Sequence, residues 1–275
     1  RLMARVRARE AFFLNLHLPD DYDVGFFHPD LDWQQVHSRP NFYLRAQGAE
    51  SAVMGQLGYK PTGTSWLGGP EFQIFNAIVA SGYSPRYVTE DEIPRCRVLV
   101  VPYVETMPAT AAQRMAAFVE QGGTLITMPV LATHDGHGTP YRGALPGGGL
   151  DRVLGLTLAT PLVGQRSLVT LPSQDPRLPM RFSPRIGSEP AYLWTYAYQR
   201  MPSLATNTHV IARNIDGVPL LTMHPYGKGR SLHLNAVTFG NFDVYETAPF
   251  QTESLRQLFD NLIRSAGVHP PLLVE

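Results

Sequence analysis

Among the residues that could do chemistry, His134-Asp135-Gly136-His137 is the most suggestive group. Two imidazoles and a carboxylate within four residues are groups that can bind a divalent metal ion. A complete site also needs a further protein ligand at a fixed spacing, and this pattern lacks one. We therefore favour a glycine-rich surface loop over a metal site, and we expect neither a metal nor another cofactor.

Further polar and aromatic residues follow predicted strands. Together with the group above, this carboxyl-edge rim comprises His28, Asp30, Asp32, Trp33, Tyr103, Glu105, His134, Asp135 and His137. In an open parallel sheet the carboxyl ends of the strands gather at one edge, where ligands and partner surfaces are usually met. The predicted topology, and no single residue, makes this rim a candidate site.

Four aromatic residues alternate with smaller ones near the middle of the chain: Tyr192, Trp194, Tyr196 and Tyr198. A period of two is typical of a strand with one aromatic face. Such a face could belong to the core, to an interface, or to a platform that stacks against sugar rings. We favour core or interface, because most aromatic side chains serve packing.

Several catalytic motifs are absent from the sequence. Gly147-Gly148-Gly149 lacks the Lys-Ser/Thr pair of a phosphate-binding loop, and no Gly-x-Ser-x-Gly occurs. Cys96 is the single cysteine, and it precedes a predicted strand where a nucleophile would follow one. We expect it to be a small buried apolar residue, with no part in a disulfide or a multi-cysteine zinc site.

Composition limits the class of protein. The chain has 275 residues, 44% of them hydrophobic, which suffices for one large domain or two small ones. Lys plus Arg equals Asp plus Glu, at 23 each, so neither nucleic acid nor an anionic membrane is an expected partner. One cysteine and no signal-like segment favour a cytoplasmic location. Because the sequence begins at Arg1, we expect an upstream domain to precede it.

The elements that position these residues are most readable in the middle of the chain. A continuous apolar strand is predicted over 97–103, a helix opens at Pro108 and ends at Gly122-Gly123, and a second strand covers 124–128. Strand, helix and strand in this order form a βαβ unit with a right-handed crossover. With a strand at 22–27, the pattern predicts a doubly wound α/β domain with a mostly parallel sheet.

The second half of the chain has a different pattern. Short strand-like segments predict a β-rich insertion at about 160–204, and three strands within 209–237 predict an antiparallel meander. An amphipathic helix over 252–266 then ends at Gly267. We predict a lead-in helix or linker over 1–21, one domain over 22–268, and an exit linker over 269–275.

Some of these segments together resemble a known family. They are the run 96–103, the helix and Gly-Gly-Thr unit within 111–125, the loop 143–156, and the glycine-lysine-glycine hairpin within 225–234. In this order they look like the glutamine-amidotransferase-like domain of family 42 beta-galactosidases, also called the trimerisation domain. That resemblance implies a flavodoxin-like, class I amidotransferase-like fold.

The resemblance also implies where chemistry is missing. Family 42 enzymes use two glutamates on an (α/β)8 barrel, which would precede this domain, so no glutamate of this chain inherits either role. Class I amidotransferases place a nucleophilic cysteine on a sharp turn after a strand. Here the strand 124–128 continues as Pro129-Val130-Leu131, without a nucleophile.

Two hypotheses follow from these observations. By the resemblance, the chain is a non-catalytic module of a glycoside hydrolase, whose partners are the upstream catalytic barrel and further copies of the chain, with a trimer favoured. Such a module would hold subunits together and wall a neighbouring active site. The alternative is a small enzyme or ligand-binding domain that uses His134, Asp135 and His137 together with Asp30 and Asp32.

Overall fold

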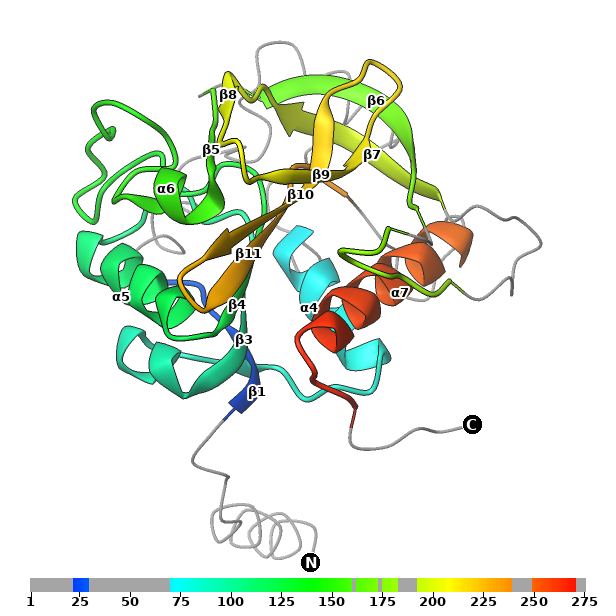
Figure 1. The fold of residues 1–275 in the computed structure, drawn as a ribbon, viewed down its shortest axis with the longest axis horizontal. Coiled ribbons are helices and arrows are strands. Elements are labelled where there is room, and N and C mark those ends of the chain that lie inside the picture. The colour runs from blue at the N-terminus through cyan, green and yellow to red at the C-terminus, as the bar shows by residue number, and fades with distance from the viewer. Residues whose placement is uncertain are drawn as a thin grey trace, which may run out of the picture.

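The structure, a computed structural model, describes residues 22–29, 70–159, 162–172, 175–182, 192–238 and 249–270. Its centre is a seven-stranded sheet with the order β2-β1-β3-β4-β11-β10-β9 (Figure 1). The strands are β1 (Tyr22–Phe26), β2 (Arg86–Tyr87), β3 (Cys96–Val101), β4 (Thr124–Thr127), β9 (His209–Arg213), β10 (Pro219–Tyr226) and β11 (Gly229–Leu234). From β2 to β11 all neighbours are parallel, whereas β10 runs antiparallel to β11 and β9.

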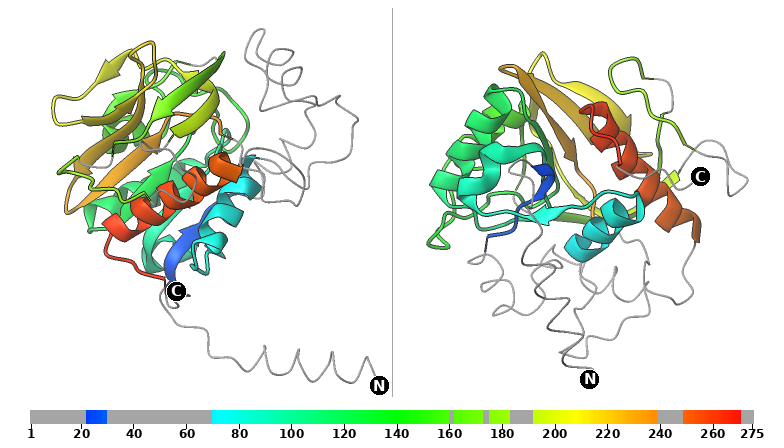
Figure 2. Two further views of the ribbon diagram at one scale, coloured as in Figure 1. Left: turned by 90° about the vertical axis from the view of Figure 1, so that its right-hand side faces the viewer. Right: turned by 90° about the horizontal axis from the view of Figure 1, so that it is seen from below.

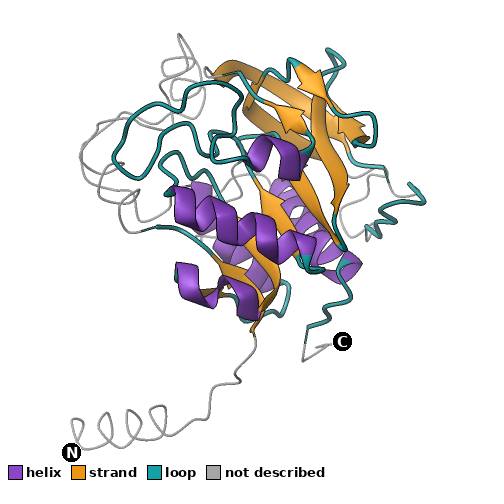
Figure 3. Ribbon diagram, turned by 60° about the vertical axis from the view of Figure 1, so that its left-hand side comes forward, coloured by secondary structure: helices purple, strands orange, loops and turns teal. Residues whose placement is uncertain are grey.

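Helices cover both faces of this sheet, as the right-hand view of Figure 2 and Figure 3 show. The first face carries α4 (Pro70–Ala80) and α7 (Pro249–Ser265), and the second carries the 3-10 helix η2 (Glu90–Arg95), α5 (Ala109–Glu120) and α6 (Leu150–Leu154). The doubly wound, mostly parallel fold is therefore confirmed. Within the described ranges, no helix combines the length and apolar character needed to cross a bilayer.

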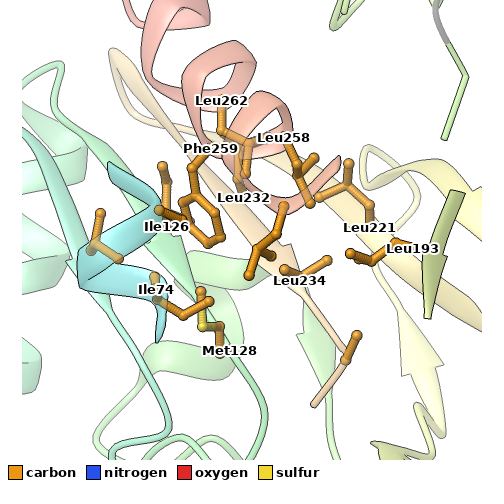
Figure 4. Packing of buried hydrophobic residues seen from close by; sticks show 14 of the residues in the cluster. Ile74, Ile126, Met128, Leu193, Leu221, Leu232, Leu234, Leu258, Phe259 and Leu262 are labelled. Atoms are coloured by element: carbon orange, nitrogen blue, oxygen red, sulfur yellow. The ribbon is translucent and has the colours of Figure 1, made fainter. Parts of the chain in front are cut away.

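Successive side chains of each strand point to opposite faces of the sheet, so a hydrophobic core forms on each face. In β3, Val98 and Val100 face α4 and α7, while Leu99 and Val101 face α5. Figure 4 shows the first core, where Phe259 of α7 reaches the sheet between its neighbours on that helix. Truncation of a fully buried phenylalanine such as Phe259 typically costs about 3–5 kcal/mol.

Helix α5 shows how the sequence produces this packing. Its buried residues, Ala111, Ala112, Met115, Phe118 and Val119, recur at three- and four-residue spacing and form one apolar stripe. The backbone N–H of Gly123 donates to the Phe118 carbonyl, and a Cβ at Gly123 would come within 2.3 Å of the Phe118 ring. The glycine stop after this helix is thus a packing requirement as well as a helix end.

The predicted β-rich insertion and meander are present. In the insertion, β6 (Leu162–Thr170) pairs antiparallel with β7 (Tyr192–Gln199), and β5 (Leu156–Thr157) pairs with β8 (Ser203–Leu204). The meander β9-β10-β11 is a continuation of the central sheet, because β11 pairs in parallel with β4. The sequence predicted its hairpins but not this long-range pairing.

Candidate functional site

The loops that follow β3 and β4 meet at the carboxyl edge of the sheet, the edge at which β1 also ends. Those after β3 and β4 are joined by backbone hydrogen bonds: the His134 N–H donates to Glu105, and the Met107 N–H donates to His134. A bridge between Thr106 and His134 extends this pairing. The structure thus brings the loops after β3 and β4 together, whereas the loop after β1 lies outside the described residues beyond Pro29.

A half-buried contact between an imidazole and a carboxylate connects the same two loops. His134 Nδ1 lies 3.2 Å from Glu105 Oε1, and the two side chains are 18% and 17% exposed. The Thr133 hydroxyl lies 2.9 Å from the same imidazole nitrogen. A histidine beside a carboxylate can transfer protons, but catalysis also needs a nucleophile or a polarising group within reach.

Asp135 serves the local turn. Its Oδ1 accepts hydrogen bonds from the backbone N–H groups of His137, at 2.9 Å, and Thr139, at 3.0 Å. The bond from Thr139, and then that from His137, hold the pKa of the Asp135 carboxyl below its usual value. His137 itself is exposed. The described residues contain no cluster of three or more His, Cys, Asp or Glu side chains suited to a metal ion.

Another residue of the predicted rim, Tyr103, lies inside the domain. Its side chain is fully buried. Its hydroxyl donates to the Ala236 carbonyl at 3.2 Å and accepts a hydrogen bond from the Thr238 N–H at 3.3 Å. Tyr103 therefore supports the edge from within, because two backbone groups satisfy its hydroxyl. His28 is half-buried.

Part of the predicted rim cannot be placed. Asp30, Asp32 and Trp33 lie outside the described residues. The site described here therefore does not include these three residues.

The turn after β4 has the backbone geometry of a strained elbow but carries an apolar residue. Val130 has a φ of 58°, in the left-handed region that β-branched residues rarely adopt. Its side chain is buried, and its N–H donates to Gln199 Oε1 at 2.6 Å. Where a nucleophile would be presented, the chain thus has a buried valine fixed by a glutamine of the insertion.

This glutamine belongs to a buried polar network. Gln199 Nε2 donates to the Ala159 carbonyl at 2.8 Å. The Asn235 side chain accepts from the Gln199 N–H at 2.9 Å and donates to the Gln199 carbonyl at 2.7 Å and to the Pro219 carbonyl at 3.1 Å. The insertion, the β4 turn and the start of β10 are therefore locked together at the carboxyl edge.

The aromatic strand predicted from the alternation is β7. The side chains of Tyr192, Trp194 and Tyr196 lie outside the described ones. Tyr198 is buried at 5% exposure, so it contributes to the core, as the favoured interpretation allows. No sugar-stacking role can be assigned to it.

Sequence reasoning missed one surface feature beside this network. Ile215, in the turn between β9 and β10, is 85% exposed, the largest exposure among the large hydrophobic side chains described. Next to the turn is an open groove with a volume of about 440 Å3, lined by Tyr198, Arg200, Met201, Asp216, Gly217, Val218 and Pro219. The available signal was a bulky apolar residue inside an Asn-Ile-Asp-Gly turn, a position that turns usually give to polar residues.

Comparison with known proteins agrees with the fold and with the resemblance noted in the sequence. The family model described as the beta-galactosidase trimerisation domain matches residues 87–269. No curated protein sequence matches the chain.

Solved structures of beta-galactosidases have a similar fold. The enzyme from Bacillus circulans sp. alkalophilus aligns over 94% of this chain with a TM-score of 0.66 and 17% identity. A family 42 enzyme from G. stearothermophilus aligns over 92% with a TM-score of 0.64 and 14% identity. The enzyme from Halorubrum lacusprofundi aligns over 90% with a TM-score of 0.57 and 15% identity. The chain spans about a third of the length of these proteins, with 33%, 31% and 31% covered.

Proposed function

The chain belongs to the family of beta-galactosidase trimerisation domains, and from this premise we propose that it is a non-catalytic assembly domain of a beta-galactosidase-type glycoside hydrolase. Its partners are the catalytic barrel of the same protein and further copies of the chain. Three copies form the closed assembly, in accordance with the family description.

The observation that carries the non-catalytic part is the turn after β4. Val130 occupies the strained position, and its N–H is bonded to Gln199. Nucleophilic catalysis at such an elbow needs a cysteine or serine whose side chain reaches the solvent, together with a base. A buried valine supplies neither, and the one cysteine, Cys96, is buried at the start of β3.

The polar residues of the described rim also favour an architectural role. Glu105 and His134 pair with each other, and Asp135 caps its own turn. Because these side chains stabilise the joined loops, the carboxyl edge is rigid. A rigid edge is suited to be a contact surface for another part of an assembly. The alternative of a small enzyme built on Asp135 and His137 gains no support from these contacts.

The assay for this role compares the chain with the complete protein that contains it. Purified chain should release no nitrophenol from nitrophenyl galactosides and no ammonia from glutamine, because the catalytic carboxylates belong to the barrel. Turnover by the chain that persists through purification and disappears when one of its own residues is mutated would overturn the proposal.

A finer part of the proposal is that the carboxyl edge walls a neighbouring active site. Replacement of the exposed His137 by tryptophan in the complete protein should then change KM for a galactoside several-fold while the assembly stays intact. Replacement of the exposed Gln121, beyond the far end of α5, serves as the control. Equal KM values for both variants and the parent would remove the walling role and leave the assembly role standing.

A further inference from the structure

We propose that Ile215 and the groove beside it form the contact between copies of this chain, with Ile215 of one copy seated in the groove of the next. This inference rests on the proposed assembly function and names the surface that performs it. The partner that occupies the groove is a second copy of the chain, not the barrel or a small molecule.

The turn that carries Ile215 is rigid. Asn214 Oδ1 accepts hydrogen bonds from the N–H groups of Asp216, at 3.0 Å, and Val218, at 2.8 Å. The Gly217 N–H donates to the Asn214 carbonyl, and the Arg213 guanidinium donates to the Gly217 carbonyl at 2.7 Å. The isoleucine between them is 85% exposed. Because the backbone of this turn is already fixed by these bonds, little backbone conformational entropy is lost when a partner covers the isoleucine.

The groove is equally well defined. One wall is the end of β7 and the residues after it, with Tyr198, Arg200 and Met201, and the other is the turn itself, with Val218 and Pro219. Asn235 joins the two walls, because its side chain is bonded to Gln199 next to Tyr198 and to Pro219. The groove is therefore held open by buried hydrogen bonds.

The chemistry of the surface favours another copy as the occupant. An apolar projection lies beside an apolar-lined groove, and the groove also carries one positive residue, Arg200, and one negative residue, Asp216. A surface that carries a projection, a groove, a positive residue and a negative residue can contact a rotated copy of itself. In such a contact the projection of each copy fills the groove of the next. Repetition of such a head-to-tail contact around an axis forms a ring when the rotation between copies closes, and the family description gives three as the number of copies.

This surface and the last described residues lie at opposite edges of the sheet. Because β10 runs antiparallel to β11, with Leu221 opposite Leu234, the turn before β10 lies at the carboxyl edge. The last described residues lie at the opposite edge, where the Arg97 guanidinium bonds to the Gly267 carbonyl and pairs with Asp23. The end of the described chain therefore lies away from the groove.

The test uses the complete protein with a photo-crosslinking amino acid at position 215. Equal amounts of normal and 15N-labelled protein are mixed, and the crosslinked peptides are identified by mass spectrometry. The inference requires crosslinks between normal and labelled copies that join position 215 to residues 198–201 or 216–219. Crosslinks within one copy are expected in either case, because residues 216–219 flank position 215. Crosslinks between copies that join position 215 to the barrel or to another surface would overturn the inference.

Variants give an independent measure by analytical ultracentrifugation. Ile215→Glu should weaken association by roughly tenfold or more, while Ile215→Leu retains it. Val79→Glu, at a site on α4 that is 46% exposed, is the matched control and should leave association unchanged. An oligomer unaffected by Ile215→Glu refutes the contact but not the assembly function, whereas a parent protein that is monomeric throughout refutes both.

Discussion

Gln199 of β7 accepts a hydrogen bond from the backbone N–H of Val130, across 69 residues of sequence and at a distance of 2.6 Å. The contact joins the β-rich insertion to the turn that follows the central strand β4. It fixes a residue whose φ of 58° is unfavourable for valine. In this domain, the place where related folds would do chemistry is used to attach an insertion.

Replacement of Gln199 by methionine should lower the free energy of unfolding by roughly 2–6 kcal/mol. The substitution preserves the volume of the side chain but leaves the Val130 N–H and the Ala159 carbonyl without this partner, at about 1–3 kcal/mol each. Urea unfolding measures the difference. Gln121→Met, on the surface, is the control; equal stability of the two variants would contradict the importance of the network.

The packing between β1 and β3 provides a second prediction. A Cβ at Gly25 would lie 2.4 Å from the Cys96 sulfur, so Gly25→Ala should cost roughly 1–3 kcal/mol by overpacking. Cys96→Ala removes the sulfur, and the double variant should regain part of that loss. A double-mutant cycle from thermal or urea unfolding measures the coupling. Strictly additive effects would mean that the strand at Gly25 shifts instead.

His233 makes the stability of the fold depend on pH. The imidazole is fully buried beside the Thr127 hydroxyl, and burial lowers its pKa from 6.5 to about 3. Between these values the unfolded chain binds the proton and the folded chain does not. The stability associated with neutral His233 is therefore complete above pH 6.5 and is lost as the pH falls toward 3, by at most about 1.4 kcal/mol per pH unit.

His233→Asn should remove this part of the acid sensitivity. The stability difference between the parent and the variant should shrink as the pH is lowered from 6.5 to 4.5, whereas the curve of the surface variant Gln121→Met, which changes no titratable group, should run parallel to that of the parent. Urea unfolding at a series of pH values measures both curves. A constant difference between the parent and His233→Asn would show that His233 does not carry the effect.

Local sequence patterns predicted the elements of the fold but not all of their pairings. The spacing of apolar residues, and the glycines that end the helix, predicted α5, β3 and β4 correctly. These elements are buried between the two faces of the sheet and the helices on it, and burial determines which residue types they need. The parallel pairing of β11 with β4 joins segments about 100 residues apart, and no local pattern encodes it. The burial of Tyr103 was missed for a similar reason, since its partners Ala236 and Thr238 follow a distant strand.

The same limit applies to the candidate site. The sequence indicated the missing nucleophile after β4, because that is a question of residue type at one position. It could not show that Val130 is strained or that Gln199 holds it, since both depend on the docking of the insertion. Sequence patterns did not single out Ile215, because Asp216-Gly217 already accounted for the turn. Only the structure shows that the apolar side chain of this turn is exposed.

The central claim is that this domain assembles subunits, and the mass of the complete protein in solution tests it most directly. Multi-angle light scattering at micromolar concentration should give three times the mass of one chain, and Ile215→Glu should shift the protein toward the monomer. A parent protein with the mass of a single chain at every concentration up to about 100 μM, far above the dissociation constant of a standard interface, would contradict the account.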